Sequence, residues 1–318
     1  TTYTYDLSGR LTSRTPPQGD ATTFTYDTTR GLLDRVQGPI EARYFYNSAG
    51  QITEIRAPSV SNPEVRSYDS NGRLTKVGVD TLGSSTNYDD VATYNEDGQV
   101  ASITRWVPGT TKRYTTNYTY DGAGRLHTAT TMDGDTVIAT TEYEWDADGN
   151  RVSVATTGEP TVTATYDAAN RLLATSDGTT YTYDDGYLTG TSDGASYTYN
   201  PFGELIAAMA GGDSVAYTRD ALGRMASRTE DGFSRSYSYE GTTSAIIGAL
   251  SSNQTFTQVV RDSSGMTLGE SIIGGATTWA RYNVHGDIAR FNNHTCSIIF
   301  DTCGPGTSTV WAASYDAF

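Results

Sequence analysis

Residues that bind metals, form disulfides or act as catalytic bases are scarce in this sequence. Its 318 residues include two cysteines, three histidines and four methionines. No apolar run approaches the roughly 18 residues that a membrane-spanning helix needs, and no charged stretch followed by an apolar one marks a signal peptide. We therefore expect no membrane segment within this fragment.

Positive charge is also in short supply. The sequence contains 22 lysines and arginines against 37 aspartates and glutamates, which gives a formal net charge of −15. The acidic residues are spread along the chain, so their field repels phosphate backbones, and we expect no nucleic-acid partner. Neither a P-loop nor a dinucleotide-binding glycine motif is present. The sequence therefore predicts no cofactor.

Tyrosine and glycine are abundant where other proteins carry aliphatic core residues. Tyrosine outnumbers phenylalanine 23 to 8, there are 33 glycines, and hydrophobic residues make up only 36% of the chain. A buried tyrosine needs a partner or a water molecule at its hydroxyl group. We therefore expect a thin and partly hydrated interior.

One phrase recurs along the chain: an aromatic residue, Asp or Asn, two variable residues, Gly, a long polar residue and an aliphatic one. The clearest copies contain Tyr5, Asp6 and Gly9; Tyr46, Asn47 and Gly50; Tyr68, Asp69 and Gly72; Tyr94, Asn95 and Gly98; Tyr120, Asp121 and Gly124; and Tyr199, Asn200 and Gly203. Weaker copies begin at Tyr26, Trp145, Tyr166 and Tyr183, while Arg219 and Arg261 replace the aromatic residue. Successive copies lie about 16 to 26 residues apart, which fits one β-hairpin per copy.

The chemistry of the phrase explains why it should form a turn. Asp or Asn at the first position of a type I turn accepts hydrogen bonds from backbone N–H groups, and Gly at the fourth position takes a positive φ without strain. Such a turn closes a bulged hairpin. Asn170 stands at the glycine position of one copy, and Asn tolerates the left-handed region well. We therefore interpret the repeated Tyr, Asp or Asn, and Gly as structural turn residues without a catalytic role.

The residues before each turn alternate, as in Thr2-Tyr3-Thr4-Tyr5 and Tyr118-Thr119-Tyr120. Alternation puts tyrosines on one face of a strand and threonines on the other. About two dozen strands at ~4.8 Å each would form a sheet on the order of 115 Å wide, and open twisted sheets rarely pass about ten strands without curling. The sequence predicts an all-β fold of tandem β-hairpin repeats, wound into a curved spiral sheet around a hollow.

The regularity of the repeats varies along the chain. Residues 1–240 hold the regular hairpins, and residues 241–318 hold divergent ones. Residues 241–280 are the most apolar stretch, which would form either ordinary strands between layers or a plug in the hollow. Short apolar runs bounded by Gly and Ser favour strands. Because a repeat array grows as one body, we expect one continuous structure.

The repeated phrase resembles the YD or Rhs repeats of a family that includes bacterial polymorphic toxins, insecticidal toxin-complex subunits, wall-associated proteins and teneurins. The resemblance rests on the YDxxGRL copies with a preceding Tyr-Thr-Tyr, and it covers nearly the whole chain. It implies a spiral shell of β-hairpins with a hollow interior. In bacterial members this shell encloses a toxic C-terminal segment, and in teneurins it serves cell-surface adhesion.

The end of the chain resembles the stretch that leads into the Rhs-associated core of this family. Residues 282–288 and 315–318 carry the likeness, but the DPxGL-like cleavage motif of relatives is absent, so their self-cleavage is assigned to no residue here. We expect a segment of a longer, secreted or cell-surface polypeptide. The predicted function is a structural shell that encapsulates or displays a C-terminal, toxin-like segment of its own chain. The alternative is adhesion to a surface glycan or a partner protein.

Two groups of residues remain as candidate sites. Cys296 and Cys303 could form a disulfide, bind a metal with His294 or stay free; an extracellular array favours the disulfide, and these three ligands are too few for a structural zinc site. The aromatic residues best suited to a sugar ring or a partner protein are Trp106, Trp145, Trp279 and Trp311. Because no nucleophile motif is present and histidine is rare, we expect no enzymatic activity.

Overall fold

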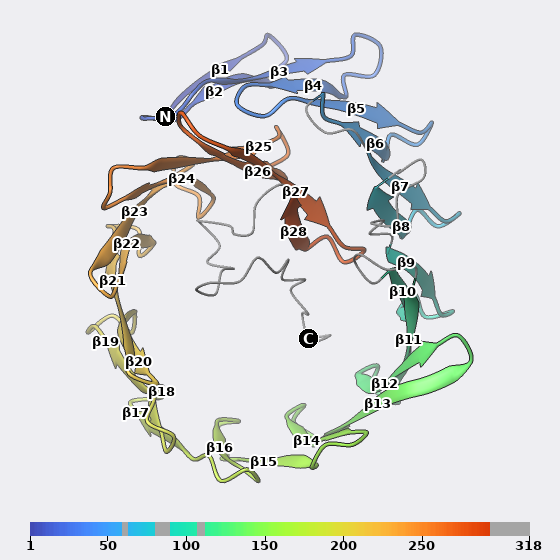
Figure 1. Ribbon diagram of the computed structural model, residues 1–318, viewed down its shortest axis with the longest axis vertical. Coiled ribbons are helices and arrows are strands. Elements are labelled where there is room, and N and C mark those ends of the chain that lie inside the picture. The colour runs from blue at the N-terminus through green and yellow to red at the C-terminus, as the bar shows by residue number, and fades with distance from the viewer. Residues whose placement is uncertain (59–62, 80–89, 107–111, 293–318) are drawn as a thin grey trace. The chain divides into compact units, whose positions relative to one another are not determined.

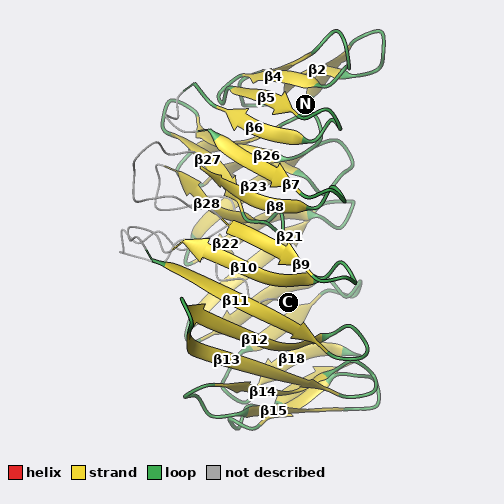
Figure 2. Cartoon of the chain, turned by 90° about the vertical axis from the view of Figure 1, so that its right-hand side faces the viewer, coloured by secondary structure: helices red, strands yellow, loops and turns green. Residues whose placement is uncertain are grey.

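The computed structural model describes residues 1–58, 63–79, 90–106 and 112–292, which form antiparallel β-strands joined by short turns (Figure 2). Within these ranges there is no helix, and so none that is long and apolar enough to cross a membrane. The expected all-β fold of tandem hairpins is confirmed. Cys296, Cys303 and Trp311 lie outside the described residues, so the disulfide stays a prediction.

The first sheet contains 16 strands in the order of the sequence (Figure 1). They are β1 (Thr2–Tyr5), β2 (Leu11–Thr15), β3 (Thr22–Tyr26), β4 (Leu33–Gln37), β5 (Ala42–Tyr46), β6 (Ile52–Arg56), β7 (Glu64–Tyr68), β8 (Leu74–Val79), β9 (Asp90–Tyr94), β10 (Val100–Trp106), β11 (Arg113–Tyr120), β12 (Leu126–Asp133), β13 (Thr136–Trp145), β14 (Arg151–Thr156), β15 (Val162–Tyr166) and β16 (Leu172–Thr175).

The second sheet contains 12 strands, again in the order of the sequence. They are β17 (Tyr181–Asp184), β18 (Tyr187–Thr191), β19 (Ser196–Tyr199), β20 (Leu205–Ala210), β21 (Asp213–Arg219), β22 (Met225–Glu230), β23 (Phe233–Tyr239), β24 (Ile246–Ser251), β25 (Phe256–Arg261), β26 (Thr267–Ile272), β27 (Thr277–Tyr282) and β28 (Ile288–Asn292). Within each sheet every strand therefore lies beside its neighbours in the chain, as hairpin repeats require, and only β16 and β17 among consecutive strands belong to different sheets.

The hairpins share a one-residue bulge beside the turn. In the hairpin β3–β4, Thr25 lies opposite Arg35 and Tyr26 lies opposite Leu33, so Asp34 has no residue opposite it. Residues directly opposite each other lie on the same face of a sheet. The aromatic and the aliphatic residue of the phrase therefore share one face. We call it the tyrosine face, and we call the other the threonine face.

The chain divides into two compact units. The first comprises Thr1–Asn87, Asp220–Ser227 and Phe233–Phe318, and the second comprises Tyr88–Arg219 and Arg228–Gly232. The division at residue 240 that the regularity of the repeats suggests stays a prediction.

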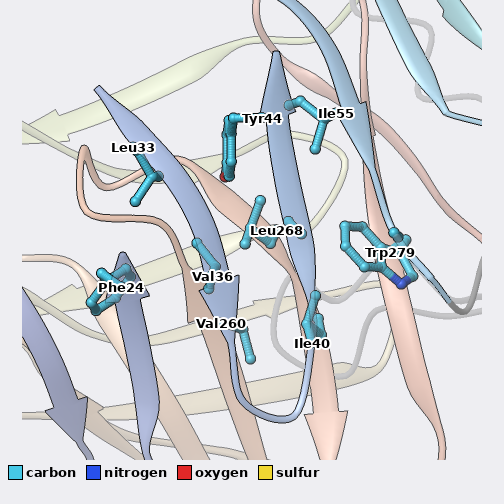
Figure 3. Packing of buried hydrophobic residues seen from close by; sticks show 11 residues of the cluster. Phe24, Leu33, Val36, Ile40, Tyr44, Ile55, Val260, Leu268 and Trp279 are labelled. Carbon is cyan, nitrogen blue, oxygen red and sulfur yellow. The ribbon is translucent and has the colours of Figure 1, made fainter. Parts of the chain in front are cut away.

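A second layer covers the tyrosine face of the N-terminal hairpins in the first unit. Figure 3 shows strands of the two ends of the chain packed face to face. Buried residues of the N-terminal hairpins are Phe24, Leu33, Val36, Ile40, Tyr44 and Ile55, and they meet Val260, Leu268 and Trp279 from β25–β27. The apolar stretch 241–280 thus forms strands, three of which supply the second layer.

Polar contacts fix the position of this second layer. The side chain of Gln258 accepts a hydrogen bond from the N–H of Asp20 (2.9 Å) and donates one to the carbonyl of the same residue (2.9 Å). Arg14, which is 4% exposed, donates to the carboxylate of Glu240 (2.9 Å) and to the carbonyl of Arg261 (2.7 Å). These bonds set the register between the layers, because a shifted strand would leave buried polar groups without partners.

Gly269 allows close approach both of the paired strand β27 and of Ile40 in the other layer. A Cβ atom at this position would lie 1.9 Å from the carbonyl oxygen of Thr278 and 2.7 Å from Cδ1 of Ile40. Close approach of backbone to neighbouring atoms is one use of glycine. This glycine therefore serves packing within β26–β27 and against Ile40, and it belongs to no turn.

The second unit is a single layer over most of its length. The buried apolar side chains of its described residues are Ala92, Ile103 and Leu126, and residues 127–219 contain no buried side chain. Sheets usually bury one face against another layer. Backbone pairing and polar side-chain contacts, rather than an apolar core, hold this stretch together.

Leu268→Ala tests the second layer. Leu268 is 3% exposed, and we expect the substitution to lower the free energy of unfolding of the first unit by about 2–5 kcal/mol, because it leaves a cavity. Hydrogen exchange of the β4 and β5 amides measures the change. Leu222→Ala, in the same unit and 57% exposed, is the control and should change the free energy by less than about 0.5 kcal/mol. Equal protection of the β4 and β5 amides in the two variants would contradict the packing of Leu268 against these strands.

Candidate functional site

The repeated Asp and Gly close the turns in one way. Asp121 Oδ1 accepts hydrogen bonds from the N–H groups of Ala123 (2.8 Å) and Arg125 (2.9 Å). Gly124, with a φ of 80°, donates its N–H to the carbonyl of Asp121 (2.9 Å). The same glycine bond and a positive φ occur at Gly9, Gly50, Gly72 and Gly203, which follow Asp6, Asn47, Asp69 and Asn200. Asn170 takes a φ of 60° at the glycine position of its turn.

The second carboxylate oxygen of these aspartates holds the long polar residue of the phrase. Arg125 Nε donates to Asp121 Oδ2 at 2.8 Å, and Arg10 Nε donates to Asp6 Oδ2 at 2.7 Å. Hydrogen bonds from the backbone N–H of the arginine, together with its guanidinium, lower the pKa of Asp6 and of Asp121. Because these carboxylates are ionised at neutral pH and their oxygens bond within the turn, they act as structural acceptors.

The same polar residue also reaches the following turn. The guanidinium of Arg125 donates to the carbonyl of Asp146 at 2.8 Å. That of Arg10 donates to the carbonyl of Gly31 at 3.4 Å and lies over the ring of Tyr26, 4.5 Å from its centroid. One side chain thus couples a turn to its neighbour through a hydrogen bond and a cation–π contact.

The aromatic residue of the phrase bonds its hairpin to the preceding one. The hydroxyl of Tyr120 donates to the carbonyl of Val100 at 2.8 Å, and Val100 is the first strand residue after the preceding turn. We call this contact the latch. The same latch joins Tyr26 to Leu11, Tyr46 to Leu33, Tyr68 to Ile52, Tyr166 to Arg151, Tyr183 to Leu172, Tyr239 to Met225 and Tyr282 to Thr267, at 2.6–2.9 Å.

Three hairpins form the latch with an N–H group. Trp145 Nε1 donates to the carbonyl of Leu126 (2.7 Å), Arg219 donates to that of Leu205 (3.1 Å), and Arg261 donates to that of Ile246 (3.3 Å). In the sequence the two arginines replace the aromatic residue of the phrase, and the structure shows that they keep its hydrogen bond. The sequence does carry a signal for the latch, because these copies all have a long side chain with an O–H or N–H donor at this position.

The latch lies where backbone pairing between hairpins stops. Strands β10 and β11 pair as far as Ser102 opposite Asn117, and Val100 and Tyr120 lie beyond this pair, toward the turn. A backbone carbonyl needs a donor when water cannot reach it freely. The hydroxyl of Tyr120 takes the place of the backbone N–H that the neighbouring strand no longer supplies.

The latched residues give the second unit its tyrosine face. Strand β11 places Tyr114, Tyr118 and Tyr120 on this face, each partly buried. Burial raises the pKa of Tyr118 and of Tyr120 above the ordinary value for tyrosine. On the opposite face, the hydroxyls of Thr119 and Thr128 bond across β11 and β12 at 2.6 Å. Threonine pairs also occur on the tyrosine face, as between Thr116 and Thr131 (3.1 Å), so the aromatic rings are what marks this face.

The tryptophans predicted to contact a ligand lie in separate environments. Trp145 forms a latch, and Trp279 is 5% exposed in the core of the first unit. The guanidinium of Arg113 lies over the ring of Trp106, 3.3 Å from its centroid. Trp311 lies outside the described residues. The role of these residues as ligand contacts stays a prediction.

Within the described ranges, no group of three or more His, Cys, Asp or Glu side chains is arranged to hold a metal ion. A metal-binding reading of Cys296 and Cys303 lies outside these ranges. The arrangement that the sequence repeats consists of a closed turn, a side chain that reaches the next turn and a latch to the preceding hairpin.

Tyr120→Phe removes one latch and keeps the ring. We expect the local stability of β10 and β11 to fall by about 1 kcal/mol, since the carbonyl of Val100 loses its donor. Tyr114→Phe is the matched control, because Tyr114 lies on the same strand and face and no described residue bonds its hydroxyl. Hydrogen exchange of the β10 and β11 amides measures both variants. A loss of protection in the control as large as that in Tyr120→Phe would argue against the latch.

Latched tyrosines should also make the first unit sensitive to alkali. Burial, reinforced by nearby carboxylates, raises the pKa of Tyr46 and of Tyr282 to about 12 from the model-compound value of 10.0. A group whose pKa is raised by folding contributes stability below its unfolded pKa, and this contribution is lost as pH rises through the folded pKa. We expect stability to fall between about pH 10 and 12, as tyrosinate absorbance and circular dichroism would show. Tyr46→Phe should reduce the fall, and an unchanged profile would count against the assignment.

The hairpin fold resembles that of solved toxin structures. A Tc holotoxin pore from Photorhabdus luminescens with a mutation in TccC3 matches 91% of this chain with 17% identity and a TM-score of 0.59. Crystal structures of TcdB2-TccC3, and of TcdB2-TccC3 without the hypervariable C-terminal region, match 89% and 91% of this chain with 16% identity and TM-scores of 0.43 and 0.42. The chain spans 18% of the length of the first and 20% of the other two. The first likeness shows the fold.

Comparison with protein families agrees with the repeated turns and latches. No curated protein sequence matches the chain. The RHS Repeat family matches residues 5–36, and the Teneurin YD-shell family matches residues 65–268, which is more than half of the chain. The resemblance to YD and Rhs repeats is thereby confirmed. The chain belongs to the Teneurin YD-shell family.

Proposed function

We propose that the chain is a structural wall of an exported or cell-surface protein, and that its tyrosine face covers a C-terminal, toxin-like segment of the same polypeptide. Membership of the Teneurin YD-shell family and the hairpin fold support a shell role. The covered segment, which we call the guest, is the partner that the proposal adds.

The observation behind this proposal is that the side chains of residues 127–219 in the second unit are all at least partly exposed. In the first unit, β25–β27 lie on the tyrosine face and bury Phe24, Val36 and Ile55. In the second unit, residues 127–219 have no buried side chain. A sheet gains much of its stability by burying apolar surface against another layer. A guest on the tyrosine face would supply such a layer.

The chemistry of the tyrosine face suits a guest that makes many weak contacts. Tyr118, Tyr181 and Tyr197 lie on three separate strands and are partly exposed. Each ring offers apolar area together with a hydroxyl group that can donate or accept a hydrogen bond. Such a surface accommodates both polar and apolar parts of a guest without requiring a single bound geometry.

We further propose that the wall has no catalytic activity of its own. The repeated aspartates are held by backbone N–H groups and by arginine, as Asp121 is by Arg125. A general acid or base needs a group that is poised to exchange a proton with a substrate. The lowered pKa of these carboxylates and their bonds within the turn support a structural role.

Protection of the tyrosine face tests the proposal. The full-length polypeptide and a version truncated after residue 318 would be footprinted with hydroxyl radicals and analysed by mass spectrometry. We expect Tyr118, Tyr181 and Tyr197 to react several-fold less in the full-length protein, because the guest covers them. Phe202, which lies at a turn and is 86% exposed, is the control and should react equally in both. Equal reactivity of the three tyrosines would show that no guest lies on this face.

A further inference from the structure

The hairpin of residues 181–191, formed by β17 and β18, lacks the turn that the other repeats share. A two-residue turn closes it, with Asp185 (φ 47°) and Gly186 (φ 87°) at its centre. The residue after this glycine is Tyr187, whose ring lies against that of Tyr199 on the next hairpin, with 4.9 Å between the ring centroids. A ring contact thus replaces the arginine hydrogen bond that couples other turns to their neighbours.

Backbone pairing is also short on both sides of this hairpin. Ala174 opposite Thr180 is the one residue pair on the N-terminal side, and Gly190 opposite Ser196 is the one on the C-terminal side. Other neighbouring hairpins whose pairing the structure describes share at least two residue pairs, as β14 and β15 do, and β12 and β13 share six. The first sheet ends at β16 and the second begins at β17. The hydrogen-bonded ladder is therefore interrupted here.

Few other contacts hold the hairpin in place. The latch from Tyr183 to the carbonyl of Leu172 measures 2.9 Å. At the opposite edge, Thr180 and Ser192 exchange two hydrogen bonds of 2.9 Å. No side chain between residues 172 and 196 is buried. Because water can reach these groups, it can replace their hydrogen bonds at little net cost in free energy.

We propose that the hairpin 181–191, here called the flap, is the point at which the wall opens. Its neighbours keep their own pairing, with three residue pairs between β15 and β16 and four between β19 and β20. The flap can therefore leave the sheet while both neighbouring hairpins stay intact. Regions with few buried contacts and exposed hydrogen bonds open at the lowest free energy. The inference rests on contacts within the chain itself and not on the proposed function.

A disulfide across the N-terminal side of the flap tests this directly. Ala174→Cys and Thr180→Cys would be introduced into the full chain together with Cys296→Ser and Cys303→Ser. Directly opposed residues of antiparallel strands have the spacing that a disulfide needs. When the disulfide is reduced, we expect the β17 and β18 amides to exchange about tenfold faster than those of β12 and β13. When it is oxidised, the β17 and β18 amides should exchange about tenfold more slowly than they do in the reduced protein.

Two controls separate opening of the flap from general loosening. A disulfide between Thr128→Cys and Glu142→Cys, which lie opposite each other on β12 and β13, should leave exchange in the flap unchanged. Tyr183→Phe should speed exchange in the flap several-fold, whereas Tyr181→Phe should not, because no described residue bonds the hydroxyl of Tyr181. The proposal is overturned if the flap amides exchange no faster than those of β12 and β13, or if oxidation of the first disulfide leaves them unchanged.

Discussion

The hydrogen bond from the aromatic residue of one hairpin to a carbonyl of the preceding hairpin is the contact on which the rest of the wall depends. Pairing between hairpins ends before the turn, and a carbonyl left without a donor costs about 1–3 kcal/mol when it is buried. Tyr120 supplies the donor as a hydroxyl, whereas Trp145 and Arg219 supply it as an N–H group. Phenylalanine would fill the same space without making this bond, which explains why tyrosine stands at this position in eight of the described hairpins.

The turns could be predicted from the sequence because their interactions are local. Asp121 bonds to residues two and four positions away, and each partner is part of the repeated phrase. The latch could not be predicted in this way, because its acceptor is a backbone carbonyl, which any residue type provides, and lies 11 to 20 positions away. Arg219 and Arg261 therefore look like lost copies in the sequence, although each keeps the donor in the structure.

The second layer of the first unit could be predicted only in part. The apolar character of residues 241–280 indicated buried strands, but it did not identify what they pack against. Asp262 illustrates the reason: Met266 stands where other turns carry arginine, and the free carboxylate oxygen accepts the hydroxyl of Tyr44 at 3.2 Å. The two residues are 218 positions apart, and burial beside this carboxylate raises the pKa of Tyr44 well above its usual value. Met266 thus departs from the repeated phrase, and the carboxylate oxygen that it leaves without an arginine bonds to Tyr44 on another hairpin.

The same kind of hairpin therefore forms both beside the apolar core of the first unit and in the second unit, because the hydrogen-bonding groups of its turn and its latch find partners without a core. In the first unit the tyrosine face carries Phe24 and Val36 and is closed by a second layer. In the second unit the same face carries Tyr114 and Tyr118, and no side chain of residues 127–219 is buried. Stability along the sheet comes from bonds at the turn edge, so the composition of the face is free to change. A wall built in this way can cover a guest with weak contacts, since its own fold does not rely on tight binding to that guest.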